Sequence, residues 1–196
     1  MRPERLCFVS KILGGLSFVA MIAALYAVFM YVPTERVMGV IQRIFYFHVP
    51  SAWVAFLAFA VVFIASILFL WKKKRTWDMV AHSSAEIGVV FTTLVLITGP
   101  LWAKPIWNTW WTWDPRLSTT LVLWLIYVAY LMLRSFTADE EKAARFAAVF
   151  GIIGFVDVPI VFMSIRWWRS IHPVLIKPKS MGMAPPMVLT LRRFCK

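Results

Sequence analysis

Five apolar runs, each long enough to cross a membrane, constrain this chain more than any other feature. The runs are Phe8–Val32, Ser51–Trp71, Met79–Leu101, Leu117–Phe136 and Ala143–Ile165. About twenty residues of helix cross the roughly 30 Å of hydrocarbon in a bilayer, and the shorter alternating segments of a barrel are absent. With 61% hydrophobic and 15% charged residues, the chain is too apolar for a water-soluble domain. We therefore predict an all-α, polytopic bundle with five complete transmembrane spans, in a single membrane domain over residues 1–196.

Two prolines predict local features of these spans. Pro50 stands just before the second run, where its fixed φ suits the first turn of a helix. Pro159 lies inside the fifth run, where its missing amide hydrogen and its ring disrupt the preceding turn. We expect a kink in the fifth span at that point.

The basic residues predict the orientation. Lys72, Lys73, Lys74 and Arg75 follow the second run and form the most concentrated basic loop. Because such loops stay on the cytoplasmic side, we place this loop, and with it the N-terminus, in the cytoplasm. The rest of the formal charge of +12 is scattered over the loops between spans. This pattern favours the edge of a lipid bilayer as the partner and no nucleic acid.

The first apolar run and the two cysteines exclude a cleaved secretory signal and two classes of protein. The first apolar run is longer than the apolar region of a secretory signal and lacks a convincing A-x-A cleavage site, so we interpret it as a retained span. The two cysteines, Cys7 and Cys195, form no C-x-x-C or C-x-x-C-H motif. The chain is therefore neither a c-type cytochrome nor a disulfide exchanger.

The stretch Leu101–Arg116 is denser in aromatic rings than any other part of the chain. It holds five of the eleven tryptophans, which are Trp102, Trp107, Trp110, Trp111 and Trp113. Four residues of this stretch have the spacing i, i+3, i+4, i+7, namely Trp107, Trp110, Trp111 and Asp114. This spacing predicts that they form one ridge on a short interfacial helix. Asp114 and Pro115 then have the pattern of an N-cap and the first residue of a new helix.

Counting membrane crossings places three features on one face of the membrane, whatever the orientation. From His48 to the tryptophan stretch the chain crosses twice, and from there to His172 it crosses twice again. His82 is one crossing away from His48. We therefore expect His82 on the opposite face, away from any site that the other features share.

Two histidines and a tryptophan-rich segment on one face match the needs of a haem site. Haem iron takes neutral imidazole nitrogens at its axial positions, so His48 and His172 are the candidate metal ligands. The flat apolar macrocycle packs well on broad rings, and its propionates pair with Arg or Lys. The candidates for this last role on this face are Arg43, Lys104, Arg116, Arg166 and Arg169. The predicted platform for the macrocycle consists of Trp107, Trp110, Trp111 and Trp113. Arg116 is the predicted partner of a propionate.

Simpler interpretations compete with this site. Tryptophans at span ends usually anchor a helix at the membrane interface, which explains Trp53, Trp71, Trp77, Trp167 and Trp168. Each histidine taken alone is more simply an interfacial or capping residue. Asp114, the remaining candidate at the site, is more simply an N-cap. For Glu86 and Asp157, acids inside apolar runs, a functional and a structural role both stay open.

The run Trp107-Asn108-Thr109-Trp110-Trp111-Thr112-Trp113-Asp114-Pro115-Arg116-Leu117 resembles the WWD motif of the haem-handling proteins of cytochrome c biogenesis. The flanking residues are most similar to the haem exporter protein C branch (CcmC type). They are Tyr46-Phe47-His48-Val49-Pro50, the segment from Gly99 to Lys104-Pro105, and Trp167-Trp168 with His172. The resemblance covers most of residues 35–175, and its motif is very specific.

The resemblance implies a function and partners. Segment 101–116 would lie on the periplasmic face of a bacterial inner membrane and present haem b, which is carried as substrate. His48 and His172 would be the axial ligands. The protein would work with the subunits of an ABC-type exporter and load a periplasmic haem chaperone, from which haem passes to apocytochrome c.

The resemblance also implies a sixth span, and here the chain departs from the family. Its last apolar segment, Met183–Leu191, has nine residues and contains Pro185 and Pro186, whereas about twenty are required to span. We expect a truncated or frame-shifted product whose C-terminus ends on the outer face.

Two other functions are weighed against a haem carrier. A cytochrome c haem synthetase component would need large extra domains or further spans, for which this chain has no room. A permease subunit for another solute would carry polar residues through the membrane midplane, where few are present beyond Asp157. Because a carrier need not break a bond of its substrate, we predict that the chain is not an enzyme.

Overall fold

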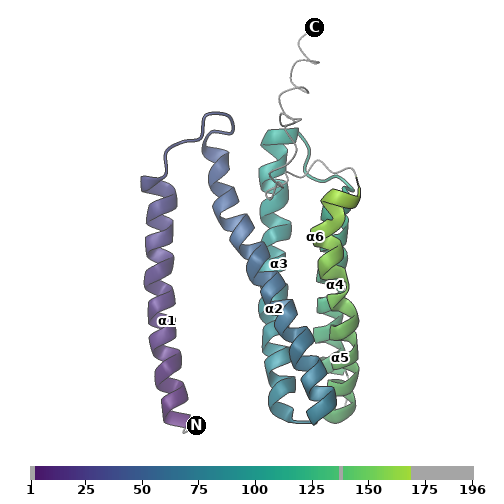
Figure 1. Ribbon diagram of the computed structural model, residues 1–196. Coiled ribbons are helices and arrows are strands. Elements are labelled where there is room, and N and C mark those ends of the chain that lie inside the picture. The colour runs from purple at the N-terminus through teal and green to yellow at the C-terminus, as the bar shows by residue number, and fades with distance from the viewer. Residues whose placement is uncertain (1–2, 137–138, 169–196) are drawn as a thin grey trace, which may run out of the picture.

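The computed structural model describes residues 3–136 and 139–168, and this part of the chain is a bundle of helices without a β-strand. Figure 1 shows the helices running up and down between two ends of the bundle. Their bounds are α1 (Pro3–Tyr26), α2 (Phe45–Lys72), α3 (Arg75–Trp107), α4 (Pro115–Phe136), α5 (Glu140–Phe155) and α6 (Asp157–Trp167). A π turn, η1 (Ala27–Tyr31), ends α1, and a 3₁₀ turn, η2 (Val40–Ile44), leads into α2.

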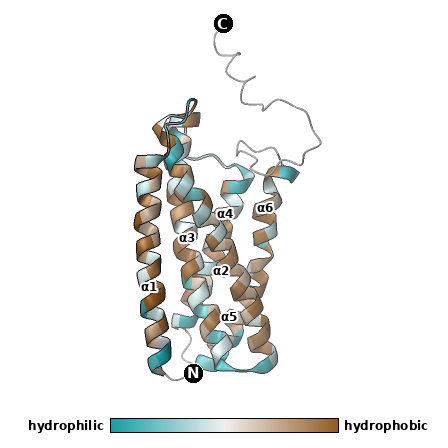
Figure 2. Ribbon diagram, turned by 60° about the vertical axis from the view of Figure 1, so that its left-hand side comes forward, coloured by the Kyte–Doolittle hydropathy of each residue, from teal (hydrophilic) through white to brown (hydrophobic). Residues whose placement is uncertain are grey.

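Five helical segments of the described part are long and apolar enough to cross a membrane, which confirms the predicted fold class. They are Cys7–Tyr31, Val40–Lys72, Arg75–Trp107, Pro115–Phe136 and Glu140–Trp167. Hydrophobic residues line the middle of the helices and hydrophilic residues gather toward both ends of the bundle (Figure 2). This distribution follows from the membrane, because only the ends of a span meet water.

The second span begins earlier than the sequence predicted. Helix α2 starts at Phe45, so His48 lies in its first turn and Pro50 in its second. The sequence pattern instead predicts that the helix begins at Pro50, because proline is favoured at the first helical position. The 3₁₀ turn η2 passes directly into α2 and fixes the earlier start. The predicted position of Pro50 is therefore wrong by about one turn.

The prediction of a short tryptophan-rich helix is also wrong. Helix α3 continues through Trp107 and ends at Asn108, which has the left-handed φ of 55°. Asparagine tolerates this conformation, which stops a helix. The side-chain ammonium of Lys104 lies 3.2 Å from Oδ1 of Asn108 and stabilises this end of α3. Residues 109–114 are not helical, so Trp107, Trp110, Trp111 and Asp114 form no ridge.

The predicted disruption of the fifth span is confirmed as a one-residue interruption of the helix, at which Val156 keeps a helical φ of −59° and ψ of −29°. Helices α5 and α6 are separated by a single turn residue, Val156, three positions before Pro159. Proline lacks the amide hydrogen that would pair with the carbonyl of Phe155, and its ring crowds that carbonyl. The fifth span therefore consists of two stacked helices.

Small residues let the helices pack closely. The buried core residues of α2, α3 and α5 include many alanines, which are Ala55, Ala65, Ala81, Ala85 and Ala147. A Cβ at Gly88 would come within 2.3 Å of the ring of Phe59, so glycine is required where α3 crosses α2. The Phe59 ring stacks on Tyr127 of α4 with centroids 3.8 Å apart. Close backbone approach of this kind is the main source of helix association in lipid.

Helix α1 stands apart from the other helices (Figure 1). None of the residues in its most apolar stretch is buried. Its exposed side chains, among them Leu16, Phe18 and Val19, would meet lipid, which is as apolar as they are.

A buried ion pair joins α3 and α4 at the end of the bundle that carries the Lys72–Arg75 loop. The guanidinium of Arg134 donates to both carboxylate oxygens of Asp78, and Nη2 lies 2.9 Å from Oδ2. The side chains are 21% and 9% exposed. A bidentate pair of this kind fixes the two helices in one register.

Breaking this pair is expected to destabilise the bundle. Asp78→Asn leaves the Arg134 charge half-buried beside a neutral amide, so we expect the free energy of unfolding to fall by on the order of 3 kcal/mol. The matched control is Glu140→Gln, which breaks the exposed pair between Glu140 and Arg75 and should change stability much less. Unfolding by SDS in mixed micelles, followed by circular dichroism, measures both. Equal losses in the two variants would contradict the structural role of Asp78.

Candidate functional site

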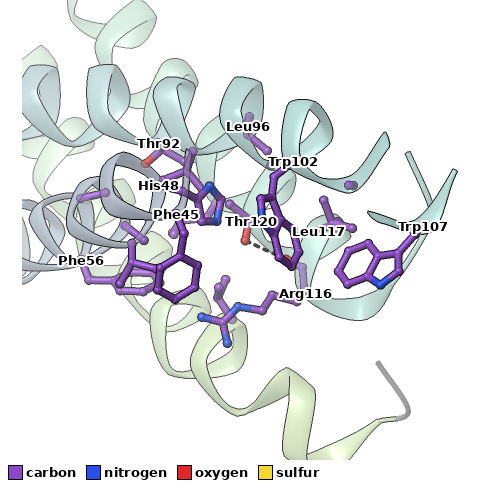
Figure 3. A pocket seen from close by; sticks show the side chains of 18 residues that line it. Phe45, His48, Phe56, Thr92, Leu96, Trp102, Trp107, Arg116, Leu117 and Thr120 are labelled. Atoms are coloured by element: carbon purple, nitrogen blue, oxygen red, sulfur yellow. Dashed lines mark hydrogen bonds between the residues drawn. The ribbon is translucent and has the colours of Figure 1, made fainter. Parts of the chain in front are cut away.

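A cavity opens between α2, α3, α4 and Val161 of α6, at the end of the bundle opposite the Lys72–Arg75 loop. Figure 3 shows the side chains that line it. Its volume is about 80 Å³, well below the roughly 300–1,000 Å³ of sites that enclose a whole small molecule, so it could take only part of a larger ligand. Most of its lining is aliphatic or aromatic, and its ring-bearing and charged residues are Phe45, His48, Phe56, Trp102, Trp107 and Arg116. The cavity is therefore apolar, with an imidazole and a guanidinium as its main polar groups.

His48 enters the cavity from the first turn of α2. Its Nδ1 lies 2.9 Å from the hydroxyl oxygen of Thr98 on α3, a residue that the sequence analysis did not select. A Cβ at Gly99 would stand 3.5 Å from Cε1 of His48, so the imidazole lies directly against the α3 backbone. The antiparallel α2–α3 hairpin produces this contact, because it brings the start of α2 beside the end of α3.

Arg116 enters the cavity from the first turn of α4. Figure 3 shows its guanidinium extending toward Phe45. Of the basic residues predicted on this face, it alone among the described ones lines the cavity. Arg43 lies over the Phe29 ring at 5.8 Å, and Arg166 is exposed. Arg169 lies outside the described residues.

Asp114 caps α4, as the sequence predicted. Its Oδ1 accepts a hydrogen bond from the backbone amide of Arg116 at 3.0 Å, and its carbonyl accepts one from Ser118 at 2.9 Å. The side chain is 8% exposed. Asp114 therefore sets where α4 begins and so positions Arg116 at the cavity.

The tryptophans of the stretch divide into two groups. Trp102 and Trp107 line the cavity and meet edge to face with centroids 5.0 Å apart. Trp110 and Trp113 are 57% and 78% exposed, and Trp111 packs edge to face on Trp113 at 5.9 Å. Of the four predicted platform residues, only Trp107 contributes to the cavity wall.

Trp102 is a cavity residue that sequence reasoning missed. Its indole Nε1 is buried and has no hydrogen-bond partner among the described residues. A buried indole N–H is usually paired, so this donor is available to a polar group of a bound molecule. Trp102 belongs to the tryptophan stretch, which was a signal in the sequence, but the predicted ridge began only at Trp107.

The two other histidines stand in different positions. His82 lies near the opposite end of α3, with its Nε2 3.6 Å from Oε1 of Glu86. This agrees with the crossing count, which placed His82 away from His48. His172 lies outside the described residues, so its predicted place beside His48 stays a prediction.

The donor set indicates what kind of metal the cavity suits. The described part of the chain holds no group of three or more His, Cys, Asp or Glu side chains that could bind a bare ion. A single imidazole in an apolar cavity instead suits a metal that brings its other ligands with it, as iron does in a macrocycle. Flat rings along one wall and a guanidinium at the side fit such a molecule.

Comparison with known proteins gives a family match over nearly the whole chain. The family model described as Heme exporter protein C matches residues 5–194. A ccmC-like mitochondrial protein of cytochrome c biosynthesis from Marchantia polymorpha is 36% identical over 163 residues, which are 83% of this chain and 69% of that protein.

Two bacterial relatives are named Heme exporter protein C. The protein from Bradyrhizobium diazoefficiens is 38% identical over 140 residues, which are 71% of this chain and 53% of that protein. The protein from Escherichia coli K12 is 37% identical over 145 residues, which are 74% of this chain and 59% of that protein. The chain thus spans a little over half the length of these two relatives.

The capping role of Asp114 can be tested by its effect on stability. Asp114→Ala removes the cap of α4 and should lower the free energy of unfolding by about 1 kcal/mol, whereas Asp114→Asn keeps an acceptor and should remain close to wild type. Thermal unfolding in detergent measures the difference. If asparagine destabilises the protein as much as alanine does, capping is not the role of this side chain.

Proposed function

We propose that this chain, which belongs to the haem exporter protein C family, is an inner-membrane haem-handling protein of cytochrome c maturation. It binds haem b as cargo at the periplasmic face and delivers it to a periplasmic haem chaperone, together with the subunits of an ABC-type exporter. The observation that carries the proposal is the imidazole of His48 in an apolar cavity beside Trp102, Trp107 and Arg116.

His48 and His172 hold the iron in this proposal. A neutral imidazole nitrogen is the usual protein ligand of haem iron. The surroundings of His48 are apolar apart from the guanidinium of Arg116 in the same cavity lining. His172 supplies the second axial ligand from beyond the fifth span.

The cavity and the tryptophans hold the macrocycle. One edge of haem enters between α2 and α3, where it meets the rings of Trp102 and Trp107 and a propionate reaches Arg116. The outer edge stays in reach of Trp110, Trp111 and Trp113, of which two are largely exposed. Segment 101–116 is then the haem-presenting part of the single membrane domain.

The orientation of the bundle supports delivery on the periplasmic side. The basic block Lys72–Arg75 stands at the opposite end from the cavity, and such blocks stay in the cytoplasm (Figure 1). The N-terminus is then cytoplasmic. Binding and release of haem break no covalent bond of the cargo, so this function makes the chain a carrier and not an enzyme.

The axial-ligand assignment is tested with the protein purified from haem-replete membranes. His48→Ala and His172→Ala should each lower the haem content and shift the Soret band, because an axial nitrogen is lost. The matched control is His82→Ala, which removes a histidine from the opposite end of α3 and should keep the wild-type spectrum.

Two results would contradict the proposal. Unchanged spectra in both His48→Ala and His172→Ala would remove the assigned ligands. A wild-type protein that carries no haem after purification and takes up none on titration would remove the function itself.

The exposed tryptophans separate a haem platform from membrane anchoring. The double variant Trp110→Ala/Trp113→Ala should bind haem more weakly than wild type, by roughly thirtyfold, and so retain less of it, since stacking of an aromatic system on a ring contributes on the order of 1 kcal/mol for each ring. Trp71→Ala removes a ring that is 76% exposed at the opposite end of the bundle and should leave haem content unchanged. Haem content measured by pyridine haemochrome assay in reconstituted protein decides between them. Equal haem content in all these proteins would identify the rings as membrane anchors.

A further inference from the structure

The hydroxyl of Thr98 makes two contacts that determine its role beside His48. Its oxygen lies 2.9 Å from Nδ1 of His48, and it donates a hydrogen bond to the carbonyl of Leu94, one turn earlier in α3, at 2.7 Å. A hydroxyl has one hydrogen to donate and two lone pairs that accept. Because the hydrogen is directed to Leu94, the oxygen accepts in the contact with the imidazole. Nδ1 of His48 must then carry the hydrogen.

A second threonine on the same helix shows this arrangement with a partner that can only donate. Thr93 donates its hydroxyl hydrogen to the carbonyl of Val89 at 2.8 Å and accepts from the indole nitrogen of Trp124 at 2.8 Å. The indole N–H has no acceptor capacity, so the direction of that bond is fixed. A threonine bonded back to the carbonyl of residue i−4 thus serves α3 as an acceptor toward a ring N–H from a neighbouring helix.

We propose that Thr98 is a positioning residue that holds His48 in the tautomer with Nδ1 protonated and Nε2 as the nitrogen that binds iron. The proposal rests on the proposed function for its purpose, but the tautomer itself is a property of the haem-free protein. A neutral imidazole has one ring nitrogen with a lone pair, and the bond made by the other nitrogen selects which one it is. The same bond fixes the rotation of the ring against α3.

The backbone of α3 supports the arrangement. The Thr98 hydroxyl is attached to a helix whose next residue, Gly99, also lies beside the imidazole, since a Cβ there would make ordinary van der Waals contact with Cε1 of His48. The acceptor is therefore held by a rigid element at a fixed distance from the ring. Groups that orient a metal-binding histidine in this way typically contribute ten- to a hundredfold in affinity for the metal.

The tautomer can be measured without haem. In protein labelled with ¹⁵N-histidine and reconstituted in lipid nanodiscs at pH 8, where imidazole is neutral, the His48 signals are identified by their loss in His48→Gln. We expect a protonated Nδ1 and an unprotonated Nε2 in wild type, and the same pattern in Thr98→Ser. Thr98→Val should abolish this selection, because the methyl group offers no acceptor. Wild-type signals with hydrogen on Nε2, or an unchanged pattern in Thr98→Val, would overturn the proposal.

Haem titration then links the tautomer to binding. Thr98→Val should weaken haem binding by about ten- to a hundredfold, and Thr98→Ser should restore it to near wild type. The control Thr93→Val removes the matching hydroxyl beside Trp124, outside the cavity, and should leave haem affinity and the His48 signals unchanged. Haem affinity that falls equally in both valine variants would indicate a packing effect and overturn the positioning role.

The two measurements also separate this inference from the proposed function. A wild-type protein with the Nδ1 tautomer that binds no haem would remove the function and keep the role of Thr98 in orienting the ring. A wild-type protein that binds haem through His48 with hydrogen on Nε2 would keep the function and remove the role of Thr98.

Discussion

Every backbone polar group within the bilayer must find its partner inside the protein, and this constraint determines where a site can form. Apart from the turn residue Val156 between α5 and α6, the described spans are helical, so the longer irregular segments lie at the ends of the bundle. The α2–α3 hairpin brings the start of one helix beside the end of the other, which places His48 against Gly99. Small residues such as Gly88 allow the helices to approach this closely. The cavity is thus a consequence of a tight hairpin that ends at the membrane surface.

Features that depend on local sequence could be predicted. The spans follow from the length of the apolar runs, and the break between α5 and α6 follows from Pro159, which cannot continue the hydrogen-bond ladder. The start of α4 follows from Asp114 and Pro115. The count of crossings placed His48 on the same face as the tryptophan stretch and His82 on the opposite face, because parity needs only the number of spans.

Features that depend on how one helix meets another could not be predicted. A periodic spacing suggested a ridge of tryptophans, but Asn108 takes the left-handed conformation and ends α3 after Trp107. The cavity wall therefore contains Trp102, from the last turns of α3, in place of the exposed Trp110 and Trp113. Thr98 could not be selected from the sequence, because its role depends on contact with the imidazole of His48, fifty positions away in the chain.

Haem has one position in the proposed function, and a density map of the haem-loaded protein, bound to an antibody fragment in a lipid nanodisc, tests this position most directly. We expect the iron at Nε2 of His48, with one edge of the macrocycle between α2 and α3 against Trp102 and Trp107. A haem bound at the opposite end of the bundle, or one in the cavity with His48 not bound to iron, would contradict the account.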